Sequence, residues 1–315
     1  MRHDLAFLFP GQGSQRVGML AEAAEQFSEV AAVFEESSDA LGFDLAALIL
    51  SDESEQLNLT EYTQPALLAA SVALWRTWIA RGGVTPSAMA GHSLGEFSAL
   101  CCAGALSLND AVTLVRERGR FMQTAVPVGV GAMAAILGLD DGIVTETCEK
   151  VSSITEGVVQ AVNFNAPGQV VIAGNCTAVD DAIAALKEAG AKRAMPLPVS
   201  APFHTSLMVP AGEKLAEVLA GVEISTPDIP VVHNVHAQTE KDPERIRQLL
   251  VQQISAPVRW TACVGRLQAM GAVQFVECGA GNVLGGLLRR IDRGLSCAYL
   301  EKPDDLQAAV KSLGT

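Results

Sequence analysis

Short apolar runs alternate with longer stretches of helical periodicity along the chain. Residues 5–9 form a continuous apolar run closed by Pro-Gly, which is typical of a buried strand that enters a turn. A second short strand of small residues is predicted at 88–91. Helical periodicity covers three stretches of this half: 19–41, 65–81 and 94–105. Buried strands joined by helices predict an α/β fold with a parallel sheet.

The segment 131–199 has its own pattern of elements. Strands are predicted at 132–137, 158–163, 169–174 and 194–199, and helices at 141–151 and 178–189. This βαββαβ order is the ferredoxin-like, split βαβ pattern, complete in one stretch. We therefore predict a small ferredoxin-like domain, residues 131–199, inserted into a large α/β domain made of residues 1–130 and 200–315.

The rest of the chain continues the alternation. Helices are predicted at 207–220, 243–254 and 260–270, and strands at 229–234 and 273–277. Apolar stretches are interrupted well before the length that crosses a bilayer, and the N-terminus lacks the features of a signal peptide. We therefore expect a cytoplasmic protein without membrane contact. The seven cysteines have no CxxC spacing, which favours reduced thiols over disulfides or a metal site.

The pentapeptide GHSLG at 91–95 matches the G-x-S-x-G nucleophile elbow. A strand is predicted before it and a helix after it, as that elbow requires. The helix N-terminus would direct free N–H groups and its positive dipole end towards an oxyanion beside Ser93. The motif predicts Ser93 as a nucleophile and an α/β-hydrolase-like large domain, although a chance match in a loop is the alternative.

A serine nucleophile needs a base, and histidine has the suitable pKa. His92 is next to the serine on the turn, where its side chain should point away from the hydroxyl. His233 and His236 flank a strand end and fit surface or packing roles. His204 follows the last strand of the inserted segment, where a cleft between the domains would open. It is the candidate base, with a structural histidine as the alternative.

Motifs spread over nearly the whole chain then carry a family resemblance. They are FPGQGSQ at 9–15, GHSLGE at 91–96, RGRFMQ at 118–123, APFH at 201–204 and QISAPVRW at 253–260. Together and in this order they resemble the malonyl-CoA:acyl-carrier-protein transacylases. The resemblance implies that Ser93 is acylated, that His204 is the base and that the main-chain carbonyl of Gln253 orients it. It also implies an oxyanion hole made of the main-chain N–H groups of Gln12 and Leu94.

The resemblance further implies a set of substrate-binding residues. Arg118 would hold the free carboxylate of a malonyl group, because its planar fork suits a carboxylate. Phe203 would favour malonyl over methylmalonyl by its bulk, and Asn163 and Met122 would line the acyl pocket. From the residues alone, the alternative is that Arg118 is a solvated arginine on the surface of a helix.

The implied substrates are malonyl-CoA and a phosphopantetheine-bearing acyl carrier protein, in a ping-pong transfer that supplies fatty acid or polyketide synthesis. Coenzyme A enters as a thioester substrate, and neither a cofactor nor a metal is implied. The net charge of −13 argues against nucleic-acid binding. It also means that the acidic carrier needs a local basic patch. The candidate cations are Arg289, Arg290, Arg293, Lys192 and Arg193.

Two rival functions share some of these features. A serine hydrolase of the α/β-hydrolase class has the same elbow, but it places an acid between the serine and a late histidine. Here a whole βαββαβ unit intervenes, and no histidine follows His236. The second rival is a catalytically inactive module that binds carrier protein, which the presence of both Ser93 and His204 disfavours.

Overall fold

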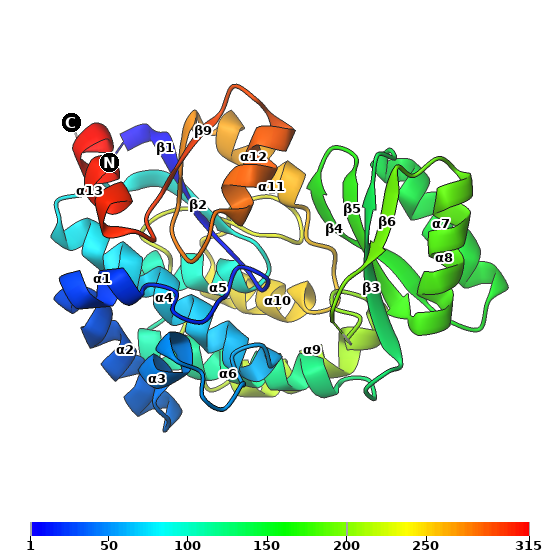
Figure 1. Cartoon of the computed structure of the whole chain (residues 1–315), viewed down its shortest axis with the longest axis horizontal. Coiled ribbons are helices and arrows are strands. Elements are labelled where there is room, and N and C mark those ends of the chain that lie inside the picture. The colour runs from blue at the N-terminus through cyan, green and yellow to red at the C-terminus, as the bar shows by residue number, and fades with distance from the viewer. Residues whose placement is uncertain (1, 200, 315) are drawn as a thin grey trace.

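The computed structural model describes residues 2–199 and 201–314, and two separate β-sheets organise them (Figure 1). The predicted domain bounds at residues 1, 200 and 315 lie outside the described residues. No helix in the described part of the chain is long and apolar enough to span a bilayer.

The larger sheet is parallel, with the strand order β7-β2-β1-β8-β9. Its strands are β1 (Arg2–Phe9), β2 (Pro86–Gly91), β7 (Val231–Val232), β8 (Gln274–Glu277) and β9 (Ser296–Tyr299). In β1 the side chains of Leu5, Phe7 and Phe9 pack into the core on one face of the sheet, and those of Ala6 and Leu8 pack into the core on the other. Burial on both faces explains the continuous apolar run.

Helices cover both faces of this sheet (Figure 1). They are α1 (Ala21–Gln26), α2 (Ser28–Leu41), α3 (Leu45–Leu50), α4 (Thr60–Ala80), α5 (Leu94–Cys102), α6 (Leu108–Thr124), α9 (Val209–Leu219), α10 (Pro243–Gln253), α11 (Trp260–Ala269), α12 (Val283–Ile291) and α13 (Pro303–Leu313), with a 3-10 turn η1 (Ser206–Met208). The pairing of Phe9 with Gly91 places the carboxyl ends of β1 and β2 side by side. The loops that leave these two strands therefore meet at one edge of the sheet.

The smaller sheet is antiparallel, with the order β4-β5-β3-β6. Its elements are β3 (Gly131–Leu137), α7 (Asp141–Ile154), β4 (Val159–Ala166), β5 (Gln169–Asn175), α8 (Cys176–Glu188) and β6 (Arg193–Pro196). In β5, Val170 and Ile172 pack with α7 and α8, whereas Val171 and Ala173 belong to the core of the larger part. The predicted fold class, a large α/β domain with an inserted βαββαβ unit, is confirmed. Its bounds at 131–199 stay a prediction.

The two parts are also joined through the main chain. Val258, in the loop between α10 and α11, exchanges hydrogen bonds with β4: its N–H donates to the Val162 carbonyl at 2.8 Å, and its carbonyl accepts from Phe164 at 3.0 Å. This pairing fixes one end of the smaller sheet against the segment that follows Gln253.

Some predicted helix limits are wrong. The helix predicted at 19–41 is two helices, because Phe27 takes an extended conformation with its side chain buried in the core. The helix predicted at 65–81 begins five residues earlier, at Thr60, so that Pro65 lies inside it. Its first residues include the buried polar side chains of Thr60 and Thr63, and the Thr63 hydroxyl donates to the Leu57 carbonyl at 2.6 Å. Apolar periodicity does not mark such a turn.

Candidate active site

Ser93 lies on a strained turn between β2 and α5. Its φ of 51° and ψ of −107° are unusual for a residue with a side chain. The flanking glycines are required by close packing of the backbone: a Cβ on Gly91 would lie 1.8 Å from the Gly95 carbonyl carbon, and one on Gly95 would lie 2.0 Å from the Phe9 carbonyl oxygen. The turn holds the serine side chain at the carboxyl edge of the parallel sheet.

The structure brings Ser93 and His204 into contact. The Ser93 Oγ lies 2.8 Å from the His204 Nε2, and the His204 Nδ1 lies 2.9 Å from the main-chain oxygen of Gln253, the last residue of α10. Because a carbonyl only accepts, Nδ1 carries the proton and donates to it. Nε2 is then the free acceptor for the serine proton.

His204 is buried, with 4% of its surface exposed, and has a positive φ of 65°. The pKa of His204 is lowered to about 3, first by burial and next by the positive charge of Arg118. The imidazole is therefore neutral at physiological pH, as a general base must be. An anion bound to Arg118 would offset part of that charge and strengthen the base.

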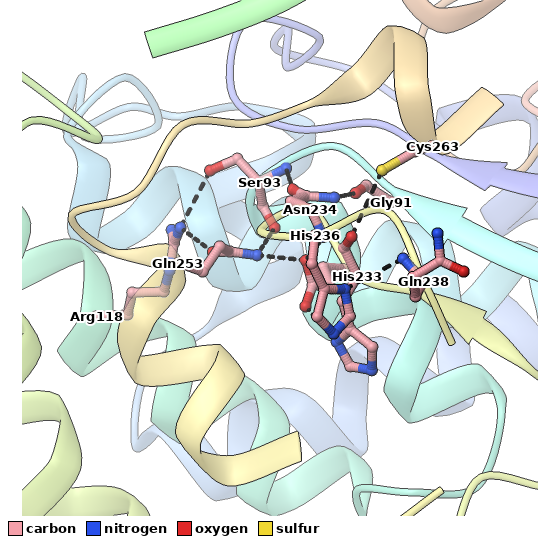
Figure 2. A network of polar contacts seen from close by, with 10 residues as sticks. Gly91, Ser93, Arg118, His233, Asn234, His236, Gln238, Gln253 and Cys263 are labelled. Atoms are coloured by element: carbon pink, nitrogen blue, oxygen red, sulfur yellow. Dashed lines mark hydrogen bonds and ion pairs between the residues drawn. The ribbon is translucent and has the colours of Figure 1, made fainter. Parts of the chain in front are cut away.

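Arg118, on α6, points into the same site (Figure 2). Its Nη1 donates to the Gln64 Oε1 at 2.7 Å, and its Nη2 lies 3.0 Å from the Ser93 Oγ and 2.8 Å from the Gln253 Oε1. The guanidinium carbon lies 5.1 Å from the Phe97 ring centroid. With only 2% of its surface exposed, Arg118 is not a solvated residue on a helix surface, and that alternative is wrong.

The buried charge of Arg118 forms no ion pair within the part of the chain that the structure describes. Burial lowers the pKa of Arg118 to about 9, so the guanidinium stays positive at neutral pH. Within the described residues no carboxylate lies at ion-pair distance from it, and its Nε makes no hydrogen bond. A buried cation in this state favours an anionic ligand.

Gln12 and Leu94 line the same cavity as Ser93. Gln12 is in the loop after β1, and Leu94 is the first residue of α5, so its N–H has no acceptor inside the helix. The strand pairing of Phe9 with Gly91 brings these two loops together. Their N–H groups, with the positive end of the α5 dipole, suit a developing oxyanion.

These residues surround a cavity of about 220 Å³ between the two sheets. It is lined by Gln12, Gln64, His92, Ser93, Leu94, Arg118, Met122, Met133, Asn163, Asn165, Val171, Leu197, Val199, Phe203 and His204. Each predicted site residue lines this cavity except Gln253, whose side chain is hydrogen-bonded to Arg118 and to the Ser93 carbonyl. The Asn163 Oδ1 is buried without a partner among the described residues. The same residues contain no cluster of side chains that could hold a metal ion.

The sequence interpretation missed a buried polar network behind the serine (Figure 2). The Asn234 Oδ1 accepts from the Ser93 N–H at 2.7 Å, and its Nδ2 donates to the Gly91 carbonyl at 2.8 Å. The Glu96 Oε1 lies 2.7 Å from the His233 Nδ1, and both side chains are fully buried. The only available signal was that Glu96 ends the motif at 91–96 and that Asn234 closely follows the strand β7.

A serine on a strained strand-to-helix turn, beside a buried neutral histidine, defines the class of enzymes that move acyl groups through a serine. Residues 6–291 match the family model described as the acyl transferase domain. The chain belongs to this acyl transferase family.

Relatives within the family are similar over nearly their whole length. The chain is 54% identical to the malonyl CoA-acyl carrier protein transacylase of Salmonella typhimurium, covering 98% of this chain and 99% of the relative. A solved transacylase of that name from Coxiella burnetii superposes with a TM-score of 0.97 at 45% identity, over 100% of this chain and 99% of that one. Another malonyl-transacylase, solved in complex with a type II PKS acyl-carrier protein, gives a TM-score of 0.96 at 51% identity, over 98% and 99% of the two chains.

Proposed function

We propose that this protein transfers malonyl from malonyl-CoA to the phosphopantetheine thiol of an acyl carrier protein, through an ester on Ser93. The observation that carries the proposal is the buried guanidinium of Arg118, 3.0 Å from the Ser93 Oγ and without a carboxylate partner among the described residues. An acyl group on this serine would meet a fixed positive charge. The names of the relatives, malonyl CoA-acyl carrier protein transacylases, support the same substrate pair.

In the first half-reaction, the His204 Nε2 takes the Ser93 proton as Oγ attacks the thioester carbonyl carbon. The N–H groups of Gln12 and Leu94 hold the resulting oxyanion, and losing one such donor typically costs about 3 kcal/mol of transition-state stabilisation. Collapse of the intermediate breaks the C–S bond. His204 then gives the proton to the departing coenzyme A sulfur.

The second half-reaction runs the same steps in reverse. The pantetheine thiol gives its proton to His204, its sulfur attacks the ester carbonyl, and the Ser93 oxygen leaves and recovers the proton. A thioester becomes an oxyester and then a thioester again, so these residues need no energy source and no cofactor. The neutral carbonyl of Gln253 is enough to keep the proton on the His204 Nδ1.

Arg118 would select the acyl group. Its Nε, which has no partner among the described residues, and its Nη2 can bind a carboxylate together, while its Nη1 keeps the hydrogen bond to Gln64. A charge-assisted contact contributes about 1.5 to 3 kcal/mol, which corresponds to about 10- to 150-fold over an acyl group that lacks the carboxylate. Phe203, Met122 and Asn163 line the cavity around the remaining atoms of the acyl group.

The acidic carrier would approach along α12, which lies beside β4 of the smaller sheet. Arg289 and Arg290 are exposed on α12 and bond neutral partners, the Tyr299 hydroxyl and the Gln169 side chain, so their charges stay available. We place the protein in the cytoplasm, where it would supply malonyl units for fatty acid or polyketide synthesis.

Intact-mass spectrometry after mixing with malonyl-, methylmalonyl- or acetyl-CoA tests this proposal. We expect the wild type to be malonylated, and Arg118→Ala to lose malonyl labelling while its preference shifts towards acetyl. Arg120→Ala is the matched control, because Arg120 is exposed on the same helix and its charge is paired with Glu117. Equal malonylation of the wild type and Arg118→Ala would remove Arg118 from its proposed role.

A further inference from the structure

Glu96 is a fully buried carboxylate that does not line the cavity. It is the third residue of α5, and its two oxygens accept three hydrogen bonds. The Oε1 lies 2.7 Å from the His233 Nδ1, and the Oε2 accepts from the Asn234 N–H at 2.9 Å and from the Gln253 Nε2 at 2.8 Å. A buried carboxylate is costly unless its lone pairs are satisfied, so the neighbours of Glu96 hold fixed positions.

The contact with Glu96 is one of two that set which way the side-chain amide of Gln253 faces. The Gln253 Nε2 donates to Glu96 and, at 3.1 Å, to the Ser93 carbonyl. The Oε1 is therefore turned towards Arg118 and accepts from its Nη2 at 2.8 Å (Figure 2). A reversed amide would place its NH₂ group against the guanidinium, with two donors facing each other. Glu96 and the Ser93 carbonyl, the two acceptors of the Nε2, oppose this reversal, and Glu96 makes the shorter of the two hydrogen bonds.

We propose that Glu96 is a positioning residue for selection of the acyl group. Through the Gln253 amide it holds the Arg118 guanidinium beside the acyl group on Ser93, and this inference rests on the proposed malonyl transfer. The Gln253 main-chain carbonyl, which orients His204, is held by α10 itself. Loss of the Glu96 contact should therefore reduce the advantage of a carboxylate-bearing acyl group and leave the serine and histidine chemistry largely in place.

Two conservative variants distinguish the effect of the length of the Glu96 side chain from the effect of its charge. Glu96→Gln has the same length: its oxygen can accept from Asn234 and Gln253, and its NH₂ can donate to the His233 Nδ1. That requires the His233 proton to move to Nε2, which has no partner among the described residues. Glu96→Asp keeps the charge but is one methylene shorter, so it cannot contact His233, Asn234 and Gln253 together.

The experiment measures initial rates of acyl-serine formation with malonyl-CoA and acetyl-CoA by quenched intact-mass spectrometry, together with thermal unfolding of each variant. For Glu96→Asp we expect the malonyl-to-acetyl rate ratio to fall by about 10- to 100-fold, because the rate with malonyl-CoA falls while the rate with acetyl-CoA is largely kept. A displacement of a binding group by about 1 Å can slow a reaction by this factor. For Glu96→Gln we expect a ratio close to that of the wild type.

Three outcomes would overturn the inference. They are an unchanged ratio in Glu96→Asp, an equal fall of both rates in that variant, and a loss of the ratio in Glu96→Gln as large as in Glu96→Asp. The second would indicate a general structural role, and the third a role of charge. Failure of the wild type to form a malonyl-serine would instead refute the proposed function.

Discussion

Replacing Asn234 by alanine should destabilise the turn that carries the nucleophile. The fully buried Asn234 side chain accepts from the Ser93 N–H at 2.7 Å and donates to the Gly91 carbonyl at 2.8 Å. These two hydrogen bonds connect Gly91 and Ser93, on either side of His92, to the same side chain. They also hold Ser93 at its positive φ, a conformation that costs on the order of 1 to 3 kcal/mol when nothing stabilises it.

The magnitude follows from the two groups that Asn234→Ala leaves unpaired. Each buried N–H or carbonyl without a partner costs about 1 to 3 kcal/mol. The variant should therefore lose about 2 to 6 kcal/mol of unfolding free energy. Acylation should slow as well, because the serine oxygen is no longer held beside the base.

Urea denaturation at neutral pH measures the first effect and quenched mass spectrometry the second. Asn109→Ala is the control, since Asn109 is exposed near the start of α6, and its free energy of unfolding should change by less than about 0.5 kcal/mol. If Asn234→Ala were as stable as this control and acylated as fast as the wild type, the reasoning about the turn would be refuted.

Two further predictions concern the base and the acyl pocket. Since the pKa of His204 is lowered to about 3, wild-type acylation by acetyl-CoA should stay level as the pH falls through the ordinary histidine pKa of 6.5. In Arg118→Ala the lost positive charge raises the pKa of His204, so the acid limb of the pH–rate profile should move to higher pH, and an unmoved limb would contradict this coupling. Phe203→Ala should raise the methylmalonyl-to-malonyl rate ratio, by about 10-fold or more, because it opens space for the extra methyl group. Competition between the two coenzyme A esters measures this ratio, and an unchanged ratio would show that Phe203 does not limit the pocket.

The sequence predicted the parts of the fold that depend on local pattern. The apolar run of β1, the elbow around Ser93 and the order of elements in the βαββαβ unit each follow from neighbouring residues. The limits of α4 did not, because the buried side chains at its start, Thr60 and Thr63, are polar, and Thr63 is stabilised by a contact outside the helix.

The sequence predicted some residues of the site and not others, again because only local patterns can be read from it. Motifs indicated Ser93, His204 and Arg118, but the burial of Arg118 depends on packing between α6, α4 and α5. The bond from the Ser93 N–H to Asn234 joins residues 141 positions apart. No periodicity or short motif encodes a partner at that separation, so the network behind the serine required the structure.

Locating the acyl group by peptide mapping tests the central claim most directly. After exposure to malonyl-CoA, the malonyl group should be found on Ser93, should be absent from Ser93→Ala, and should move to the thiol of a phosphopantetheine-bearing carrier protein when that is added. A malonyl group found on another residue, or one released only as free malonate in the presence of the carrier, would contradict the account.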